Sequence, residues 1–184
     1  MRNLLPAQQV SRGVRAERER AFDEFVAARY QGLLRTALAL CGDRQHAEDL
    51  TQIAFLRVHR SWRRVCAADD ADAYLHTVLV NASRSWFRRR WHGEVPMERL
   101  PESAAGPDDA ARLALRDALL RALGSLPAGQ REVLALRYLA DLSEAETARA
   151  LGCSTGTVKS RASRALATLR ESGLLRDDTN ARTP

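Results

Sequence analysis

The chain has 184 residues, of which 45% are hydrophobic and 28% are charged, with a net charge of +6 and a pI near 10.0. This composition is typical of a globular chain of one or two small domains and excludes a disordered one. The positive charge indicates a polyanionic partner, with nucleic acid favoured over a membrane surface.

The cysteines and histidines predict neither a disulfide framework nor a metal site. Cys41, Cys66 and Cys153 are far apart and form no C-x-x-C pair, so we expect reduced thiols in a cytoplasmic protein. The histidines show no ligand spacing. No apolar run approaches the roughly 18 residues of a membrane span, and Met1–Arg20 lacks the apolar core of a signal peptide. We expect no bound metal and no cofactor.

The first half of the chain shows helical periodicity. Residues 1–16 have no clear period, and we expect them to form a flexible tail. Apolar residues then recur at helical spacing over Glu17–Cys41 and again over Arg44–Trp62. Gly42 is expected to end the first of these helices. Residues 17–92 are therefore predicted to form a first helical domain.

A third helix is expected over Ala71–Arg90, with one apolar stripe and one polar stripe. The polar stripe follows the spacing i, i+4, i+7 and i+11, and consists of Thr77, Asn81, Arg84 and Arg88. Arg89 extends the basic end of the helix, where Trp86, Phe87 and Trp91 lie on either side of a run of three arginines. Basic residues among aromatic ones suit melted nucleic acid, because phosphates need charge and unpaired bases need stacking partners. An amphipathic helix with a solvated basic end explains the same pattern equally well.

A stretch without helical period follows at residues 93–109. It contains three prolines, two glycines and five acidic residues, and it predicts a flexible acidic linker between two domains. Beyond it, helices are expected over Ala110–Leu123 and from Pro127 to Tyr138, within a second domain of residues 110–175. Residues 176–184 are expected to form a tail. No strand pattern occurs, so we predict an all-α protein with two small helical domains.

The stretch Leu142–Leu169 predicts a helix, a tight turn and a second helix. Ser143 and Glu146 fit the S-x-x-E capping box at the start of the first helix. Gly152 lies where the chain must turn, and Ser154 or Thr155 then caps the second helix. The second helix presents hydroxyl and cationic side chains, namely Thr155, Thr157, Lys159, Ser160, Arg161, Ser163 and Arg164. A plain helical hairpin shares this spacing, but the basic face favours a DNA-binding helix-turn-helix.

Three stretches together resemble the extracytoplasmic-function (ECF) group of bacterial RNA polymerase sigma factors. They are AEDLTQIAFLRVHRSW at Ala47–Trp62, YLHTVLVNASRSWFRRR at Tyr74–Arg90, and the stretch Leu126–Leu169. Their order, with an acidic linker between the second and the third, is more specific than any one of them. The resemblance covers about Phe22 to Leu169. It implies that the protein directs promoter recognition, DNA opening and transcription initiation.

The resemblance also implies roles for individual residues. Asp49, Gln52 and Arg57 are the candidates for the surface that binds core RNA polymerase. Asn81 falls where the family has an asparagine that helps to hold a flipped non-template base of the minus-ten element. The resemblance further implies that four residues of the same helix contact that strand, namely Thr77, Arg84, Arg88 and Arg89. The second domain is expected to contact the minus-thirty-five element through the helix-turn-helix face described above, with Thr155 and Thr157 close to phosphates. An anti-sigma factor is a further partner found in the family.

Two other functions compete with this interpretation. A stand-alone helix-turn-helix regulator would use Glu17–Arg90 as a sensing or dimerising domain, although the Trp-Phe-Arg-Arg-Arg-Trp end of that stretch suits neither purpose. An enzyme acting on nucleic acid would need clustered carboxylates or a His/Cys/Glu site. The only dense acids before the linker are Asp69, Asp70 and Asp72, and such loops are usually just solvated. We therefore predict that the protein is not an enzyme.

Overall fold

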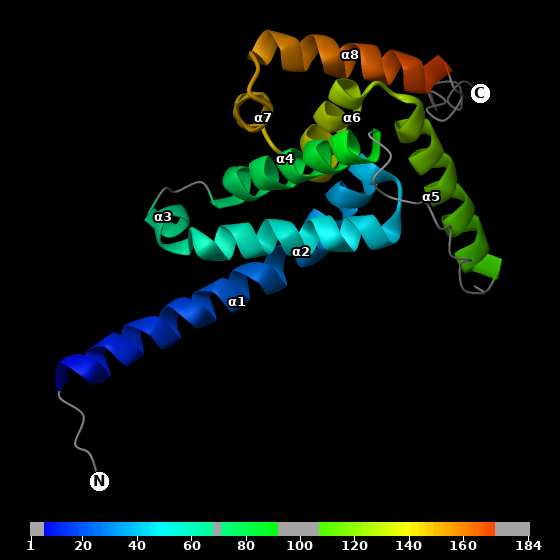
Figure 1. Cartoon of the computed structure of the whole chain (residues 1–184). Coiled ribbons are helices and arrows are strands. Elements are labelled where there is room, and N and C mark those ends of the chain that lie inside the picture. Colours follow the sequence, from blue (N-terminus) through cyan, green and yellow to red (C-terminus); the bar gives the residue numbers. More distant parts are fainter. Residues whose placement is uncertain (1–5, 68–70, 92–106, 172–184) are drawn as a thin grey trace, which may run out of the picture.

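The computed structural model describes residues 6–67, 71–91 and 107–171, and every element that these residues form is a helix (Figure 1). The first part of the chain contains α1 (Pro6–Cys41), α2 (Arg44–Arg60), α3 (Trp62–Ala67) and α4 (Ala71–Trp91). The second part contains α5 (Pro107–Ser125), α6 (Ala128–Leu134), the π-helical segment η1 (Ala135–Leu139), α7 (Glu144–Leu151) and α8 (Thr155–Glu171). The all-α prediction is confirmed.

Two helices begin earlier than predicted. Helix α1 begins at Pro6, so the expectation that residues 6–16 form a flexible tail is wrong. Helix α5 begins at Pro107, inside the predicted linker, whose remaining residues 93–106 lie outside the described ranges. Both helices begin with proline, whose fixed φ and missing N–H suit the first helical position. The N-terminal part of α1 projects away from the other helices (Figure 1), which explains why it lacks apolar periodicity.

The first part of the chain packs α1, α2 and α4 around one apolar core. Leu33 and Leu40 of α1, Val58 of α2, and Leu75 and Leu79 of α4 are each at most 2% exposed. Burial of such side chains contributes about 1.5–3 kcal/mol each. This core fixes the surfaces of α2 and α4 that remain turned outward.

The predicted helix-turn-helix is present as α7 and α8. Ser143 Oγ accepts a hydrogen bond from Glu146 N at 3.2 Å, and Glu146 Oε2 accepts one from Ser143 N at 2.6 Å, so the capping box is complete. The hydrogen bonds with Ser143 lower the pKa of the Glu146 carboxyl below its ordinary value. Gly152 adopts the left-handed conformation with φ 66°, which favours glycine, and Ser154 Oγ accepts from Thr157 N at 3.1 Å to cap α8.

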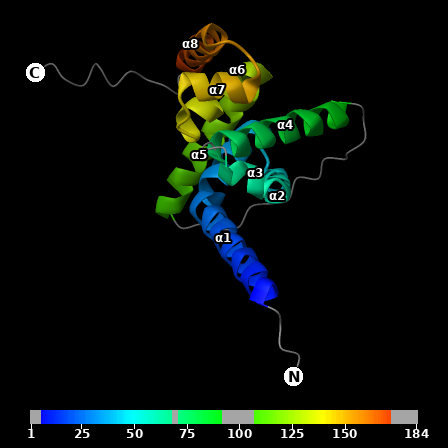
Figure 2. The same ribbon diagram turned by 90° about the vertical axis from the view of Figure 1, so that its left-hand side faces the viewer.

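The second part of the chain packs directly on the first, with α7 against α4 and with η1 and α6 against α1 (Figure 2). Helix α4 therefore has two buried faces, where the sequence predicted one apolar stripe. His76 and Val80 are 8% and 0% exposed. Burial lowers the pKa of His76, although its Nδ1 lies 2.8 Å from Asp72 O. Burial therefore favours the neutral form of this imidazole near the start of α4.

An ion pair joins the two parts across this interface. Arg84 of α4 donates from Nε to Glu132 Oε1 and from Nη2 to Glu132 Oε2 of α6, both at 2.7 Å. The Glu132 side chain is only 10% exposed, and its hydrogen bonds raise the pKa of Arg84. Arg131 beside it donates from Nη1 to Leu40 O at 3.0 Å, and its guanidinium lies 5.7 Å from the centre of the Phe87 ring. Polar contacts thus fix the register of the two parts.

We predict that Glu132→Gln loosens the interface between the two parts. Glutamine preserves the shape of the side chain but removes the charge that Arg84 pairs with, which costs about 1–3 kcal/mol. A loss of 1.4 kcal/mol raises the ratio of separated to packed chains about tenfold. Small-angle X-ray scattering should therefore give a larger radius of gyration for the variant, with unchanged helical content by circular dichroism.

Glu48→Gln is the matched control, because Glu48 pairs with Arg44 of the same helix at 2.9 Å and joins no two parts of the chain. Its radius of gyration should equal that of the wild type. Equal values for Glu132→Gln and Glu48→Gln would show that the ion pair does not hold the two parts together.

Candidate nucleic-acid interface

The second helix of the helix-turn-helix presents a cationic and hydroxyl-bearing face. Val158, Ala165 and Leu169 point into the core, with at most 5% exposure. The side chains on the other side of α8 are exposed, and they include Thr155, Lys159, Ser160, Ser163 and Arg164. Lys159 Nζ lies 3.4 Å from Glu144 Oε2 of α7, and the pair is open to solvent. A base edge or a phosphate can thus approach this face without moving the backbone.

Two of the predicted α8 residues lie differently. Thr157 is half-buried, and its Oγ1 lies 2.9 Å from Ser154 Oγ at the cap of α8. Arg161 is half-buried and turned toward α6, where a Cβ on Gly129 would lie 3.2 Å from the Arg161 Cζ. The glycine at position 129 allows this close approach. The described conformation thus places Arg161 between two helices of the same domain, away from the exposed face.

The predicted residues of the polar stripe of α4 also differ in what their side chains contact. Asn81, Arg88 and Arg89 are exposed. Arg84 is held by Glu132, as described above, and Thr77 Oγ1 donates to Ala73 O at 2.7 Å within α4. All three arginines and Asn81 thus reach the surface, but Arg84, whose side chain is 41% exposed, is also bonded to Glu132 across the interface between the two parts.

The outward face of α2 carries the predicted polymerase-binding residues Asp49, Gln52 and Arg57, all of which are exposed. Leu56 lies among them and is 60% exposed, although it is a large apolar residue. The sequence analysis missed Leu56. Its spacing is a usable signal, because a residue four positions after Gln52 and seven after Asp49 shares their face of a helix.

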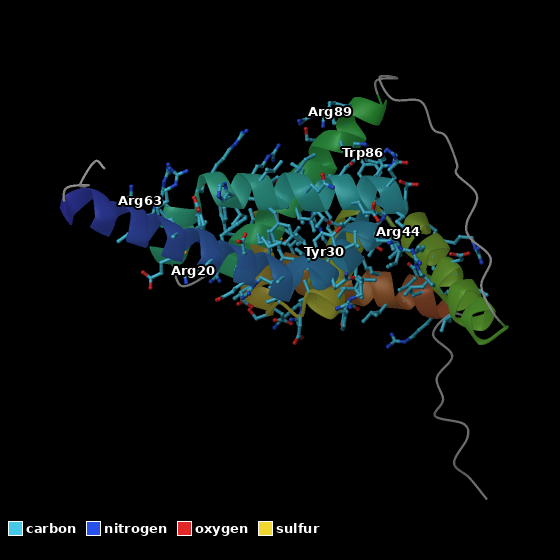
Figure 3. All side chains as sticks on the ribbon, turned by 90° about the horizontal axis from the view of Figure 1, so that it is seen from below. Arg20, Tyr30, Arg44, Arg63, Trp86 and Arg89 are labelled. Carbon is cyan, nitrogen blue, oxygen red and sulfur yellow. The ribbon has the colours of Figure 1, made fainter. Side chains whose placement is uncertain are left out.

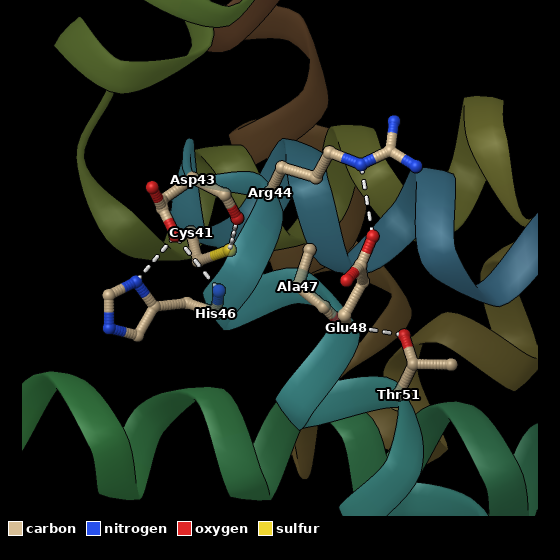
Figure 4. A network of polar contacts seen from close by, with 7 residues as sticks. All are labelled: Cys41, Asp43, Arg44, His46, Ala47, Glu48 and Thr51. Atoms are coloured by element: carbon tan, nitrogen blue, oxygen red, sulfur yellow. Dashed lines mark hydrogen bonds and ion pairs between the residues drawn. The ribbon is translucent and has the colours of Figure 1, made fainter. Parts of the chain in front are cut away.

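The start of α2 is fixed by a network of polar contacts (Figure 4). Asp43 Oδ1 accepts from His46 N at 2.8 Å and lies 2.6 Å from His46 Nδ1. Burial raises the pKa of the Asp43 carboxyl, but its contacts with His46 outweigh burial, so the pKa lies below its ordinary value. Cys41 Sγ donates to Asp43 O at 3.1 Å, and burial raises the pKa of this thiol to about 11. The network sets where α2 leaves α1, and therefore how its outward face is placed.

The described residues also allow a check of the predictions about the acidic loop, metal sites, membrane spans and cysteines. Asp72 forms an ion pair with Arg29 of α1, while Asp69 and Asp70 lie outside the described ranges. Among the residues that the structure describes, no three His, Cys, Asp or Glu side chains gather closely enough to hold a metal ion. Over the same residues, the helices fall short of the length and apolar character that crossing a membrane requires. All three cysteines lie in described segments and are free.

Comparison with known proteins identifies both parts of the chain. Residues 25–93 match the family "Sigma-70 region 2", and residues 116–169 match "Sigma-70, region 4". The RNA polymerase sigma-E factor of Streptomyces coelicolor is 45% identical over 157 residues, which cover 85% of this chain and 88% of that protein. The ECF RNA polymerase sigma factor SigM of Mycobacterium tuberculosis is 34% identical, over 88% of this chain and 82% of that protein.

Solved structures agree with the sequence relatives. The sigma factor RpoE of Bartonella quintana, in complex with the anti-sigma factor NepR, aligns with a TM-score of 0.70 and 30% identity, covering 86% of this chain and 98% of that chain. CnrH, in complex with the cytosolic domain of CnrY, aligns with a TM-score of 0.62 and 29% identity, covering 88% and 91%. The chain therefore belongs to the ECF group of the sigma-70 family of RNA polymerase sigma factors.

Proposed function

We propose that this sigma factor uses three separate exposed surfaces, two to contact promoter DNA and one to bind core RNA polymerase. The face of α8 contacts the minus-thirty-five element, the face of α4 contacts the melted minus-ten element, and the outward face of α2 binds core RNA polymerase. The exposed cationic face of α8, braced by the fully capped α7, is the observation that carries the proposal. The chain would act in the cytoplasm as a non-catalytic subunit of the polymerase.

The α8 face suits the major groove. A helix of this diameter enters the groove, where Arg or Lys donates two hydrogen bonds to guanine and hydroxyl groups contact base edges or phosphates. Arg164 and Lys159 supply the charge, and Ser160 and Ser163 supply the hydroxyls. The N-terminus of α8 adds N–H groups that favour phosphate.

The α4 face suits a single strand. Asn81 offers an amide that both donates and accepts, which matches the edge of an unpaired base. Flipping a base out of the stack costs a few kcal/mol, so phosphate contacts must offset that cost. Arg88 and Arg89 are exposed on the same helix and supply the charge for such contacts.

The outward face of α2 has the make-up of a protein-binding surface. Leu56 is an apolar centre, while Asp49, Gln52 and Arg57 form a polar rim. Protein interfaces commonly have this arrangement of an apolar core with a polar rim. Core polymerase is the proposed occupant.

Arg84 is both a proposed DNA-contacting residue of α4 and the partner of Glu132 at the interface between the two parts. A DNA contact that uses the Nε and Nη2 donors of Arg84 would require their bonds to Glu132 to break first, so we propose that promoter binding separates the two parts. The relatives RpoE and CnrH were solved with the anti-sigma factor NepR and with the cytosolic domain of CnrY, respectively. We propose an anti-sigma factor as a further partner of this chain.

We predict that Arg164→Ala lowers discrimination at the upstream element by about 1–3 kcal/mol, because a base contact is lost. Run-off transcription with core polymerase and a library of genomic fragments should give starts only when the protein is present. Alignment of these starts defines both promoter elements. The variant should then lose preference among upstream sequences.

Arg170→Ala is the matched control, because Arg170 is an exposed residue in the last turn of the same helix. It should keep the wild-type preference. An equal loss of transcription from all promoters with Arg164→Ala would show that Arg164 contacts phosphate alone. Tight duplex binding without any polymerase-dependent start would support a stand-alone regulator.

We predict that Asn81→Ala slows promoter opening and leaves the closed complex largely intact, because the base pocket is lost while the phosphate contacts remain. Permanganate oxidation of unpaired thymines measures opening, and electrophoretic mobility shift in the cold measures the closed complex. Unchanged thymine reactivity would contradict the role of Asn81 in holding a base.

We predict that Leu56→Asp weakens capture of core polymerase at least tenfold, because the change places a charge at the apolar centre of the interface. Pull-down of core polymerase by the immobilised protein measures capture. Leu115→Asp, the same change at a leucine of α5 that is 67% exposed, is the matched control. Equal capture by wild type and Leu56→Asp would remove this face from the interface.

A further inference from the structure

A basic groove lies between the N-terminal half of α1 and the junction of α2 with α3. It has a volume of about 850 Å³ and is lined by Arg15, Arg18 and Glu19 of α1 and by His59–Arg64. None of the surfaces proposed above includes it. Figure 3 shows Arg63 beside the N-terminal half of α1, well separated from Arg89 near the end of α4.

The groove has a surplus of positive charge. Its lining contains five arginines and a single carboxylate, Glu19, which pairs with Arg15 at 2.9 Å. Arg60, Arg63 and Arg64 are exposed, and no carboxylate of the described chain forms an ion pair with them. Guanidinium groups gathered in this way repel one another and attract a polyanion. Their forked geometry suits phosphate oxygens.

A second observation points to a missing acceptor at the same place. Trp62 lines the groove and is 7% exposed, and its Nε1 is a buried donor without a hydrogen-bond partner. Its ring is fixed against Phe22 and Phe25, with ring centroids 5.2 and 4.9 Å apart. Buried N–H groups are rarely left unpaired. An acceptor from a bound ligand would reach this nitrogen only after the side chains that cover it move, because the atom is buried beneath the wall of the groove.

The position of the groove selects the ligand. Helix α3 leads to the N-terminal end of α4, whereas the other end of α4 leads on toward the second domain, which we propose contacts the upstream element. A strand held along α4 therefore reaches the groove on its downstream side. We propose that the groove binds the phosphate backbone of promoter DNA just downstream of the minus-ten element. This inference rests on the proposed role of α4.

The test compares two DNA probes bound by the holoenzyme. Both carry the same melted minus-ten element, and one ends there while the other continues about ten nucleotides downstream. That extension matches α4, whose 21 residues at about 1.5 Å each span roughly 30 Å. Fluorescence anisotropy over a range of salt concentrations measures affinity for the wild type and for Arg63→Ala/Arg64→Ala.

We expect the double variant to bind the short probe like the wild type and to bind the extended probe more weakly. Two lost phosphate contacts reduce the salt slope of log K by about 1.4 for a single strand and by about 1.8 for duplex DNA. The advantage of the wild type should shrink by about sevenfold for a single strand and about twelvefold for duplex DNA between 50 and 200 mM salt. Single-stranded and duplex versions of the extension show which form the groove binds.

Arg35→Ala/Arg121→Ala is the matched control, because it removes two exposed arginines from outside the groove. Arg18→Ala tests the opposite wall and should give about half the change in slope on the extended probe. Equal losses on both probes would overturn the proposal and would instead indicate a polymerase contact. Unchanged binding to both probes would also overturn the proposal. Loss of short-probe binding in Asn81→Ala tests the role of α4 separately, so the two failures are distinguishable.

Discussion

The ion pair between Arg84 and Glu132 is the interaction on which the described arrangement of the two parts depends. The Glu132 side chain is 10% exposed, so its charge requires a partner, and Arg84 supplies two hydrogen bonds at 2.7 Å. A buried carboxylate left without such a partner would be strongly destabilising. The same guanidinium belongs to the polar stripe of α4 that faces nucleic acid in the proposed function. In the proposed function, packing of the chain and DNA binding would therefore compete for one side chain.

Local signals were sufficient to predict most helices and the helix-turn-helix. The capping box of Ser143 and Glu146, the left-handed Gly152 and the cap of α8 all involve residues within four positions of each other, so the sequence contains them directly. The first turns of α1 were missed because periodicity reports burial, and this part of α1 projects away from the other helices. Helix formation there depends on a proline at the first position and on helix-forming residues.

Contacts between distant residues were the part that the sequence could not show. His76 and Val80 lie off the apolar stripe that the sequence predicts for α4, yet both are buried in the structure, where α4 packs on α7 as well as on α1 and α2. Arg161 shares the helical spacing of the exposed α8 face, yet it turns toward Gly129, more than thirty positions earlier in the chain. The basic groove likewise brings Arg15 and Arg18 beside residues 59–64, which no local pattern relates. Helical spacing predicts which side chains share a face, but not what covers that face.

The competition for Arg84 is less costly than the strength of the ion pair alone would indicate. When the two parts separate, Glu132 returns to water, and Arg84 can exchange a carboxylate for a phosphate that accepts the same pair of hydrogen bonds. Each charged group thus keeps a polar partner in both states. Resistance to separation must then come mainly from apolar contacts between the two parts, such as those between α4 and α7, which neither water nor DNA replaces. The ion pair sets which register the two parts adopt and adds to the stability of that register, while the apolar surface supplies most of the resistance to separation.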